Sequence, residues 1–185
     1  MKKTKICNNQ KPFISTIFQS VLDRLMVSQE TKSIMFNVLL SGIIYVLIYT
    51  SLFYFVYPID LTESSNYLAR ILGSAFFFGA FSGFFTGLFA GIRVNYLNLK
   101  SPLSSGLKAG LISVIIGSIL FPPFGAFVQV NIFGDRPSAF LLNLSYLTNL
   151  SLVGVWPGAF VGVITGALGG VLSSDIVQFP KESQN

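Results

Sequence analysis

Histidine is absent from this 185-residue sequence, and cysteine occurs only once, at Cys7. The usual Ser-His-Asp and Cys-His nucleophile arrangements are therefore excluded. A single cysteine cannot form a disulfide within the chain. A metal site would have to use oxygen ligands alone, because clusters of His and Cys are missing. We predict a protein without catalytic residues, without a bound metal and without a cofactor.

Charged residues are also scarce. They make up 10% of the chain, whereas a soluble domain carries about 25%. Asp, Glu, Lys and Arg are all missing from four windows, residues 33–59, 71–92, 109–133 and 137–174. A transmembrane helix needs roughly 20 mostly apolar residues, so the windows predict an all-α integral membrane protein with four transmembrane helices. A soluble core rich in phenylalanine is the alternative.

The expected spans lie near Ile34–Tyr57, Leu68–Ile92, Gly106–Phe121 and Leu152–Leu172. The third is predicted to end at Pro122-Pro123, because proline lacks a backbone donor and disfavours helix at the residue before it. The apolar residues that follow are expected to lie in the outer interface, to fold back as a re-entrant loop, or to dock on another subunit. The predicted segments are a basic tail and helix at 1–33, a first transmembrane hairpin at 34–92, a basic cytoplasmic loop at 93–108, a second hairpin at 106–172 with an outer insertion near 122–150, and a tail at 173–185.

The N-terminal segment begins with a basic tail and continues as a predicted amphipathic helix. Its apolar residues recur at spacings of three and four, which places them on one helical face. These residues are Phe13, Ile14, Ile17, Phe18, Val21, Leu22, Leu25 and Met26. A basic tail before such a helix is typical of a segment on the cytoplasmic membrane surface; a helix packed on the bundle or on a partner is the alternative. The first long apolar run starts too late and is too long for a cleaved signal peptide.

The lysines and arginines predict the orientation, since cytoplasmic loops are enriched in them. Ten of the twelve lie in the N-terminal segment, in the loop at 93–108 or in the C-terminal tail. The other side carries Arg70 and Arg136 together with Asp60, Glu63 and Asp135. We expect a multi-pass protein of the cell (inner) membrane with both termini cytoplasmic. The net charge of +5 is then a topology signal and not a sign of nucleic-acid binding.

Glycine recurs every fourth residue in two of the expected spans. GAFSGFFTGLFAG, residues 79–91, matches GAFVGVITGALGG, residues 158–170, at seven of thirteen positions. Small residues let helices approach closely in lipid, where burying apolar side chains gives no hydrophobic gain. We predict a helix-packing glycine zipper, whose partner is the other half of the chain, another copy or another protein. Its residues are Gly79, Gly83, Gly87, Gly91, Gly154, Gly158, Gly162, Gly166 and Gly170.

The other two expected spans also resemble each other. SGIIYVLIYTSLF, residues 41–53, matches AGLISVIIGSILF, residues 109–121, at six positions. Because both members of the pair recur in order, we predict a duplicated helical hairpin, with chance similarity between apolar segments as the alternative. Each copy has two spans, so both enter the membrane in the same direction. Such parallel repeats are related by an axis along the membrane normal.

The polar groups inside the spans are mostly hydroxyls. Ser82, Thr86 and Thr165 are the candidates for lining a pathway, and the two threonines occupy equivalent positions of the repeat. The alternative is hydroxyls that bond back to the carbonyl four residues earlier or across a helix pair. Proton-coupled transporters usually place acids or histidines in their spans, and these windows have neither.

Glycine faces, uncharged spans and missing catalytic groups together favour a structural role. We expect a non-enzymatic packing or accessory subunit of a larger membrane assembly, or a homo-oligomer. Its partners are then the lipid bilayer and other membrane subunits or a second copy. The alternative is a small-solute or ion channel or facilitator, with a pathway along the axis of the duplicated hairpin. An enzyme is the weakest of the three hypotheses.

Overall fold

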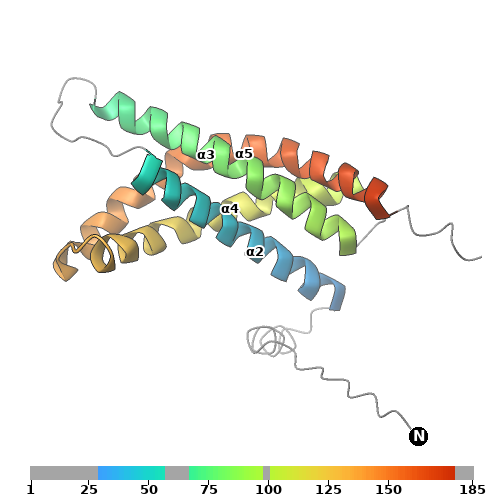
Figure 1. Cartoon of the computed structure of the whole chain (residues 1–185), viewed down its shortest axis with the longest axis horizontal. Helices are drawn as coiled ribbons and strands as arrows, with labels where there is room; N and C mark the ends of the chain where they lie inside the picture. The colour runs from blue at the N-terminus through green and yellow to red at the C-terminus, as the bar shows by residue number, and fades with distance from the viewer. Residues whose placement is uncertain (1–28, 57–66, 98–100, 178–185) are drawn as a thin grey trace, which may run out of the picture.

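The computed structural model describes residues 29–56, 67–97 and 101–177. These residues form helices joined by short connections, and no strand occurs among them. In chain order the elements are α2 (Gln29–Ser51), the π-helix η1 (Leu52–Val56), α3 (Tyr67–Leu97), α4 (Pro102–Asn131), the 3₁₀-helix η3 (Pro137–Ala139) and α5 (Phe140–Val177) (Figure 1). The predicted all-α class is confirmed for this part of the chain.

Four helices are long and apolar enough to cross a membrane, by length and composition. α3 has 31 residues, which at about 1.5 Å per residue gives a length of about 46 Å. This exceeds the hydrocarbon core of a bilayer, which is about 30 Å thick. The four candidate spans indicate a multi-pass membrane protein.

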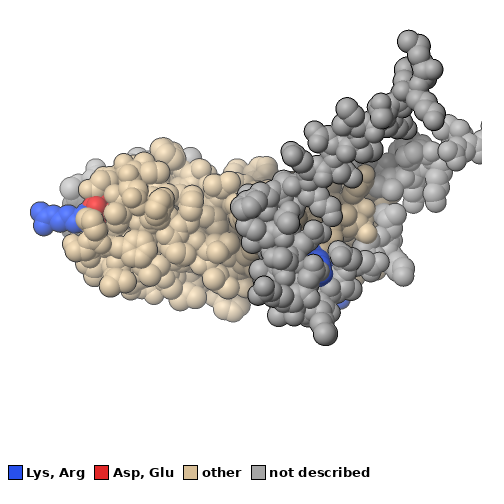
Figure 2. Space-filling model, turned by 90° about the horizontal axis from the view of Figure 1, so that it is seen from below, with Lys and Arg blue, Asp and Glu red and all other residues tan. Residues whose placement is uncertain are grey.

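The helices alternate in direction, so the starts of α2 and α4 and the ends of α3 and α5 lie together (Figure 1). This end of the bundle, which we call the basic end, carries Lys32, Arg93 and Lys108. The opposite end, which we call the turn end because α4 and α5 are joined there, carries Arg70, Asp135 and Arg136. Figure 2 shows a broad surface without charged side chains between the two ends, as a hydrocarbon environment requires.

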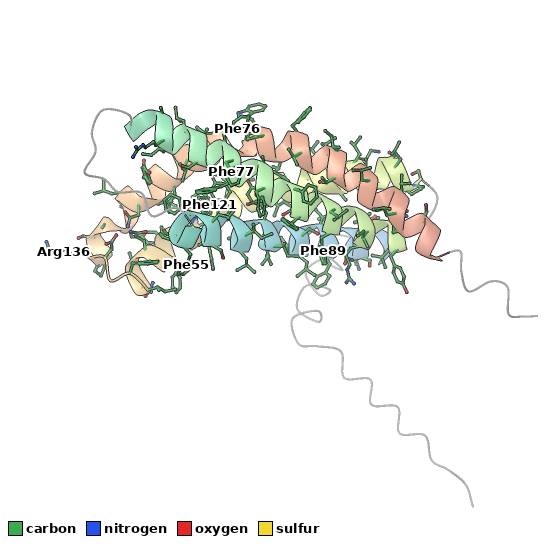
Figure 3. All side chains as sticks on the ribbon, turned by 45° about the horizontal axis from the view of Figure 1, so that its top comes forward. Phe55, Phe76, Phe77, Phe89, Phe121 and Arg136 are labelled. Carbon is green, nitrogen blue, oxygen red and sulfur yellow. The ribbon has the colours of Figure 1, made fainter. Side chains whose placement is uncertain are left out.

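α5 is the central helix of the bundle. It packs along α3 and along α4, whereas α2 contacts α4 and α3 less extensively. Phe121 of α4 lies inside the bundle, while Phe76 of α3 points away from it (Figure 3). α5, the last helix in the chain, is therefore the helix that α3 and α4 each contact most.

The half of the core nearer the turn end is aromatic. The ring centroid of the fully buried Tyr49 lies 4.3 Å from that of Phe121 and 6.0 Å from that of Phe78. Tyr45, one turn earlier on α2, is 5.7 Å from Tyr49 by the same measure. These rings join α2, α3 and α4 in one cluster.

The prediction that the third span ends at Pro122-Pro123 is wrong. α4 continues through both prolines to Asn131. Because proline lacks an N–H group, Pro122 leaves the carbonyl of Ser118 without its usual helical donor. The Ser151 hydroxyl of α5 donates to this carbonyl at 2.6 Å. A donor from the neighbouring helix thus satisfies the freed carbonyl, as membrane helices with internal proline require.

The predicted segment boundaries change accordingly. Most of the outer insertion at 122–150 is helical and forms the end of α4 and the start of α5. α5 also continues through Pro157. The basic loop at 93–108 is shorter than predicted, since α3 runs to Leu97 and α4 starts at Pro102. The amphipathic helix within 1–33 lies outside the described residues, as do Asp60, Glu63, Lys100 and residues 178–185.

Candidate functional site

α3 and α5 touch through their backbones along one face. A Cβ atom added to Gly83 would lie 2.8 Å from the Cα atom of Gly158, and one added to Gly87 would lie 2.8 Å from the Cα atom of Gly162. Contacts this short leave no room for a side chain on α3. The same stripe continues in both directions, with Gly79 against Gly154 and Gly91 against Gly166. Residue numbers rise together along both helices, so the contact is parallel.

α4 packs closely on α5 as well. A Cβ atom on Gly106 would lie 3.1 Å from the Cα atom of Gly170, and one on Gly110 would lie 3.2 Å from that of Gly166. Numbers rise along α4 as they fall along α5, so this contact is antiparallel. We call these contacts of α3, α4 and α5 the glycine seam; its residues are Gly79, Gly83, Gly87, Gly91, Gly106, Gly110, Gly154, Gly158, Gly162, Gly166 and Gly170.

Gly106 and Gly110 were missed in the sequence, although they are spaced by four residues. The repeat aligns α4 with α2, and there Val38 stands at the position of Gly106. A search for positions shared by both halves therefore passes over Gly106. A plain search for pairs of small residues four apart finds it, because such pairs are enriched where membrane helices meet.

The contacts do not follow the repeat residue by residue. The repeat equates Gly79 with Gly158. A Cβ atom on Gly79 would nevertheless meet Gly154, and one on Gly158 would lie 2.9 Å from the Gly79 carbonyl oxygen. Gly79 therefore lies between Gly154 and Gly158 along the axis. Since α4 also packs along α5 more extensively than α2 packs along α3, the two hairpins are unequal.

The two threonines at equivalent repeat positions have different surroundings. The Thr165 hydroxyl donates to the Val161 carbonyl at 2.9 Å, which is the bond to the carbonyl four residues earlier that the sequence offered as the alternative to a pathway. Thr165 also lies against Gly87 in the seam. Thr86 and Ser82 are fully buried on α3, and their hydroxyls have no hydrogen-bond partner within the described part of the chain.

Two tyrosines of α2 reach the glycines of α5. The Tyr49 hydroxyl donates to the Ala75 carbonyl at 3.4 Å and lies 2.7 Å from the place of a Cβ atom on Gly154. The Tyr45 hydroxyl lies 3.1 Å from the place of a Cβ atom on Gly158. Glycine on α5 thus makes room for the tyrosine side chains as well as for the α3 backbone.

Amide side chains join the helices at the basic end. The Asn95 amide is fully buried and donates to the Gly170 carbonyl and to the Ser173 hydroxyl, both at 2.7 Å. Arg93 donates through Nε to the Asn37 side-chain oxygen at 3.1 Å. These links connect α3 to α5 and to α2. Sequence reasoning missed both asparagines, because Asn37 is neither charged nor a hydroxyl and Asn95 lies beyond the expected second span, which ends at Ile92.

Another surface of α3 is covered by aromatic rings, which we call the phenylalanine face: Phe77, Phe81, Phe84 and Phe85. All four are exposed, and the rings of Phe77 and Phe81 are stacked with centroids 6.0 Å apart. With Ala80 and with Val161 of α5 they line a groove of about 380 Å³. Phe78, the neighbour of Phe77 in the chain, is not part of this face and is buried in the core.

Comparison of the chain with protein-family models, with curated proteins and with solved structures finds no match. The seam, the buried polar groups and the outer surface are therefore the features that bear on function.

Proposed function

We propose that this chain is a non-enzymatic membrane protein that acts as a packing or accessory subunit of a larger membrane assembly, or as a homo-oligomer. The phenylalanine face is the observation that carries the proposal. The glycines that the sequence offered as packing faces lie inside the chain. A partner would therefore have to use a different surface. The phenylalanine face is exposed and lines a groove.

The phenylalanine face suits contact with another helix. Helices in lipid associate through van der Waals packing, and a groove of about 380 Å³ between α3 and α5 offers contact on more than one side. Aromatic side chains supply a large contact area each and favour stacked or edge-to-face neighbours. Phe81 already forms such contacts with Phe77 and Phe85.

The alternative, a channel along the axis of the repeat, has little support. That axis would run between α3 and α5, where Gly83 and Gly87 bring the backbones into contact with Gly158 and Gly162. A conducting path needs water or ligand groups that replace the hydration of an ion. The contact leaves no space for either between these two helices.

Photo-crosslinking tests the proposal. The photoreactive residue p-benzoylphenylalanine replaces Phe81, and in a control it replaces Ile112, an apolar residue of α4 that lies outside the phenylalanine face and is 46% exposed. After irradiation of intact membranes, adducts are separated by size and identified by mass spectrometry. We expect a protein adduct, either a dimer of this chain or one foreign subunit, from position 81 and not from position 112. Lipid adducts alone at both positions would contradict the proposal.

A further inference from the structure

Five buried hydroxyls lack hydrogen-bond partners in the described part of the chain, those of Tyr45, Thr50, Ser82, Thr86 and Ser118. Tyr45 is 1% exposed, and Ser82 and Thr86 are completely buried. Buried polar side chains in native proteins are nearly always hydrogen-bonded to protein or to ordered water, because an unpaired group loses its hydration without compensation. Several unpaired hydroxyls in one core therefore call for a partner that is not a protein group.

The pairing of α2 with α3 places three of these hydroxyls along one stretch of the bundle interior. The two helices are antiparallel, and the Tyr49 ring contacts the Phe78 ring. Tyr45 lies one turn before Tyr49, and Ser82 lies one turn after Phe78, so the helical spacing places both of them one turn further along the antiparallel pair. Thr86 follows one turn further towards the basic end. The three groups thus share the interior face between α2 and α3.

Ser118 joins this group from α4. The Tyr45 ring packs directly on Gly117, where an added Cβ atom would lie 2.6 Å from the ring. Ser118 directly follows Gly117 on α4, which places its buried hydroxyl near the Tyr45 side chain. We define Tyr45, Ser82, Thr86 and Ser118 as the hydroxyl cluster.

We propose that the hydroxyl cluster is a binding site for internal water. Each hydroxyl can donate one hydrogen bond and accept others, and none of the four is charged. The matching ligand is small and neutral and has both donors and acceptors, and water has these properties. Buried waters typically make about three hydrogen bonds to otherwise unpaired groups, a number that this cluster can supply.

The site is closed towards the turn end. There the rings of Tyr49, Phe78 and Phe121 fill the core. Each of these side chains is at most 2% exposed. The water is therefore held in a blind site and does not form part of a continuous pore, which is compatible with the structural role proposed above and does not depend on it.

Radiolytic footprinting tests this inference with wild-type protein in lipid nanodiscs. A short X-ray pulse converts bound water into hydroxyl radicals, which modify adjacent side chains, and mass spectrometry measures the rate at each tyrosine. Tyr45 and Tyr49 form a matched pair, because both are buried, at 1% and 0% exposure. We expect Tyr45 to be modified severalfold faster than Tyr49. Equal slow rates would show that the cluster is dry and would overturn the proposal.

A pair of variants gives a second test. Thr86→Val keeps the side-chain shape but removes a partner of the water, so labelling of Tyr45 should fall. The melting temperature should drop by about 2–4 °C, the shift expected for the loss of one hydrogen bond in a chain of this size. Thr148→Val is the control, because this hydroxyl is exposed and donates to the Leu144 carbonyl of its own helix. A higher melting temperature for Thr86→Val would mean that an unpaired hydroxyl had been removed from a dry core, and would refute the site.

Discussion

Replacing Gly83 by alanine is the sharpest test of the glycine seam. The change adds one methyl group at the contact between α3 and α5. That group would lie 2.8 Å from the Cα atom of Gly158 and closer still to its carbonyl oxygen. Both atoms belong to the backbone, so no flexible side chain can move away. The two helices have to separate at this level or shift along each other.

Gly73→Ala is a matched control on the same helix. A Cβ atom there meets no atom of the described residues within 4 Å. Both variants gain the same helix propensity, roughly 1 kcal/mol for alanine over glycine, so this contribution cancels in the comparison. What remains is the cost of the extra methyl group in a filled space, typically about 1–3 kcal/mol. We expect Gly83→Ala to be less stable than Gly73→Ala by this amount.

The assay is the unfolding of purified protein by sodium dodecyl sulfate in mixed micelles, followed by circular dichroism. The free energy of unfolding is determined for the wild type and for both variants under identical conditions. If Gly83→Ala is as stable as Gly73→Ala, the backbones of α3 and α5 are not in contact at this level, and the seam is wrong there.

Three further predictions concern topology, the proline region and transport. In a Cys7→Ser background, a membrane-impermeant thiol reagent should label Glu63→Cys but not Lys100→Cys in intact cells; the reverse pattern would invert the orientation. Ser151→Ala should lower the free energy of unfolding by about 1–3 kcal/mol, because the buried carbonyl of Ser118 loses its donor; wild-type stability would show that the continuous helix does not depend on this bond. Purified protein in liposomes should conduct monovalent ions no faster than empty liposomes, and a robust flux would favour the channel alternative.

The number and the nature of the helices were predictable from the sequence. Lys108 and Asp135 bound a window without charge, and α4, from Pro102 to Asn131, covers most of that window. A charged side chain is costly within the hydrocarbon core wherever it stands. This constraint acts on each residue separately, so it can be recognised without knowing what any helix contacts.

The buried polar groups were predictable only as an inventory. Thr86 and Thr165 look equivalent in the repeat, but the Thr165 hydroxyl donates to the Val161 carbonyl of its own helix and, at 3.4 Å, to the Gly83 carbonyl of α3, while Thr86 has no partner in the described chain. The difference arises from the neighbours of each hydroxyl, and these come from other helices. Residue type and spacing record the presence of a hydroxyl but not the groups that surround it.

The sequence by itself determined that four apolar helices exist and that glycine recurs on single helical faces, because composition and periodicity are properties of one segment at a time. Only the tertiary structure decided that α5 is shared by α3 and α4, because such packing requires small residues from several helices at the same height. α4 supplies a small residue, Gly106, at this height, whereas α2 has Val38 at the equivalent position of the repeat. The tertiary structure also decided that α4 continues through Pro122, because the donor that satisfies the freed carbonyl belongs to Ser151 on another helix.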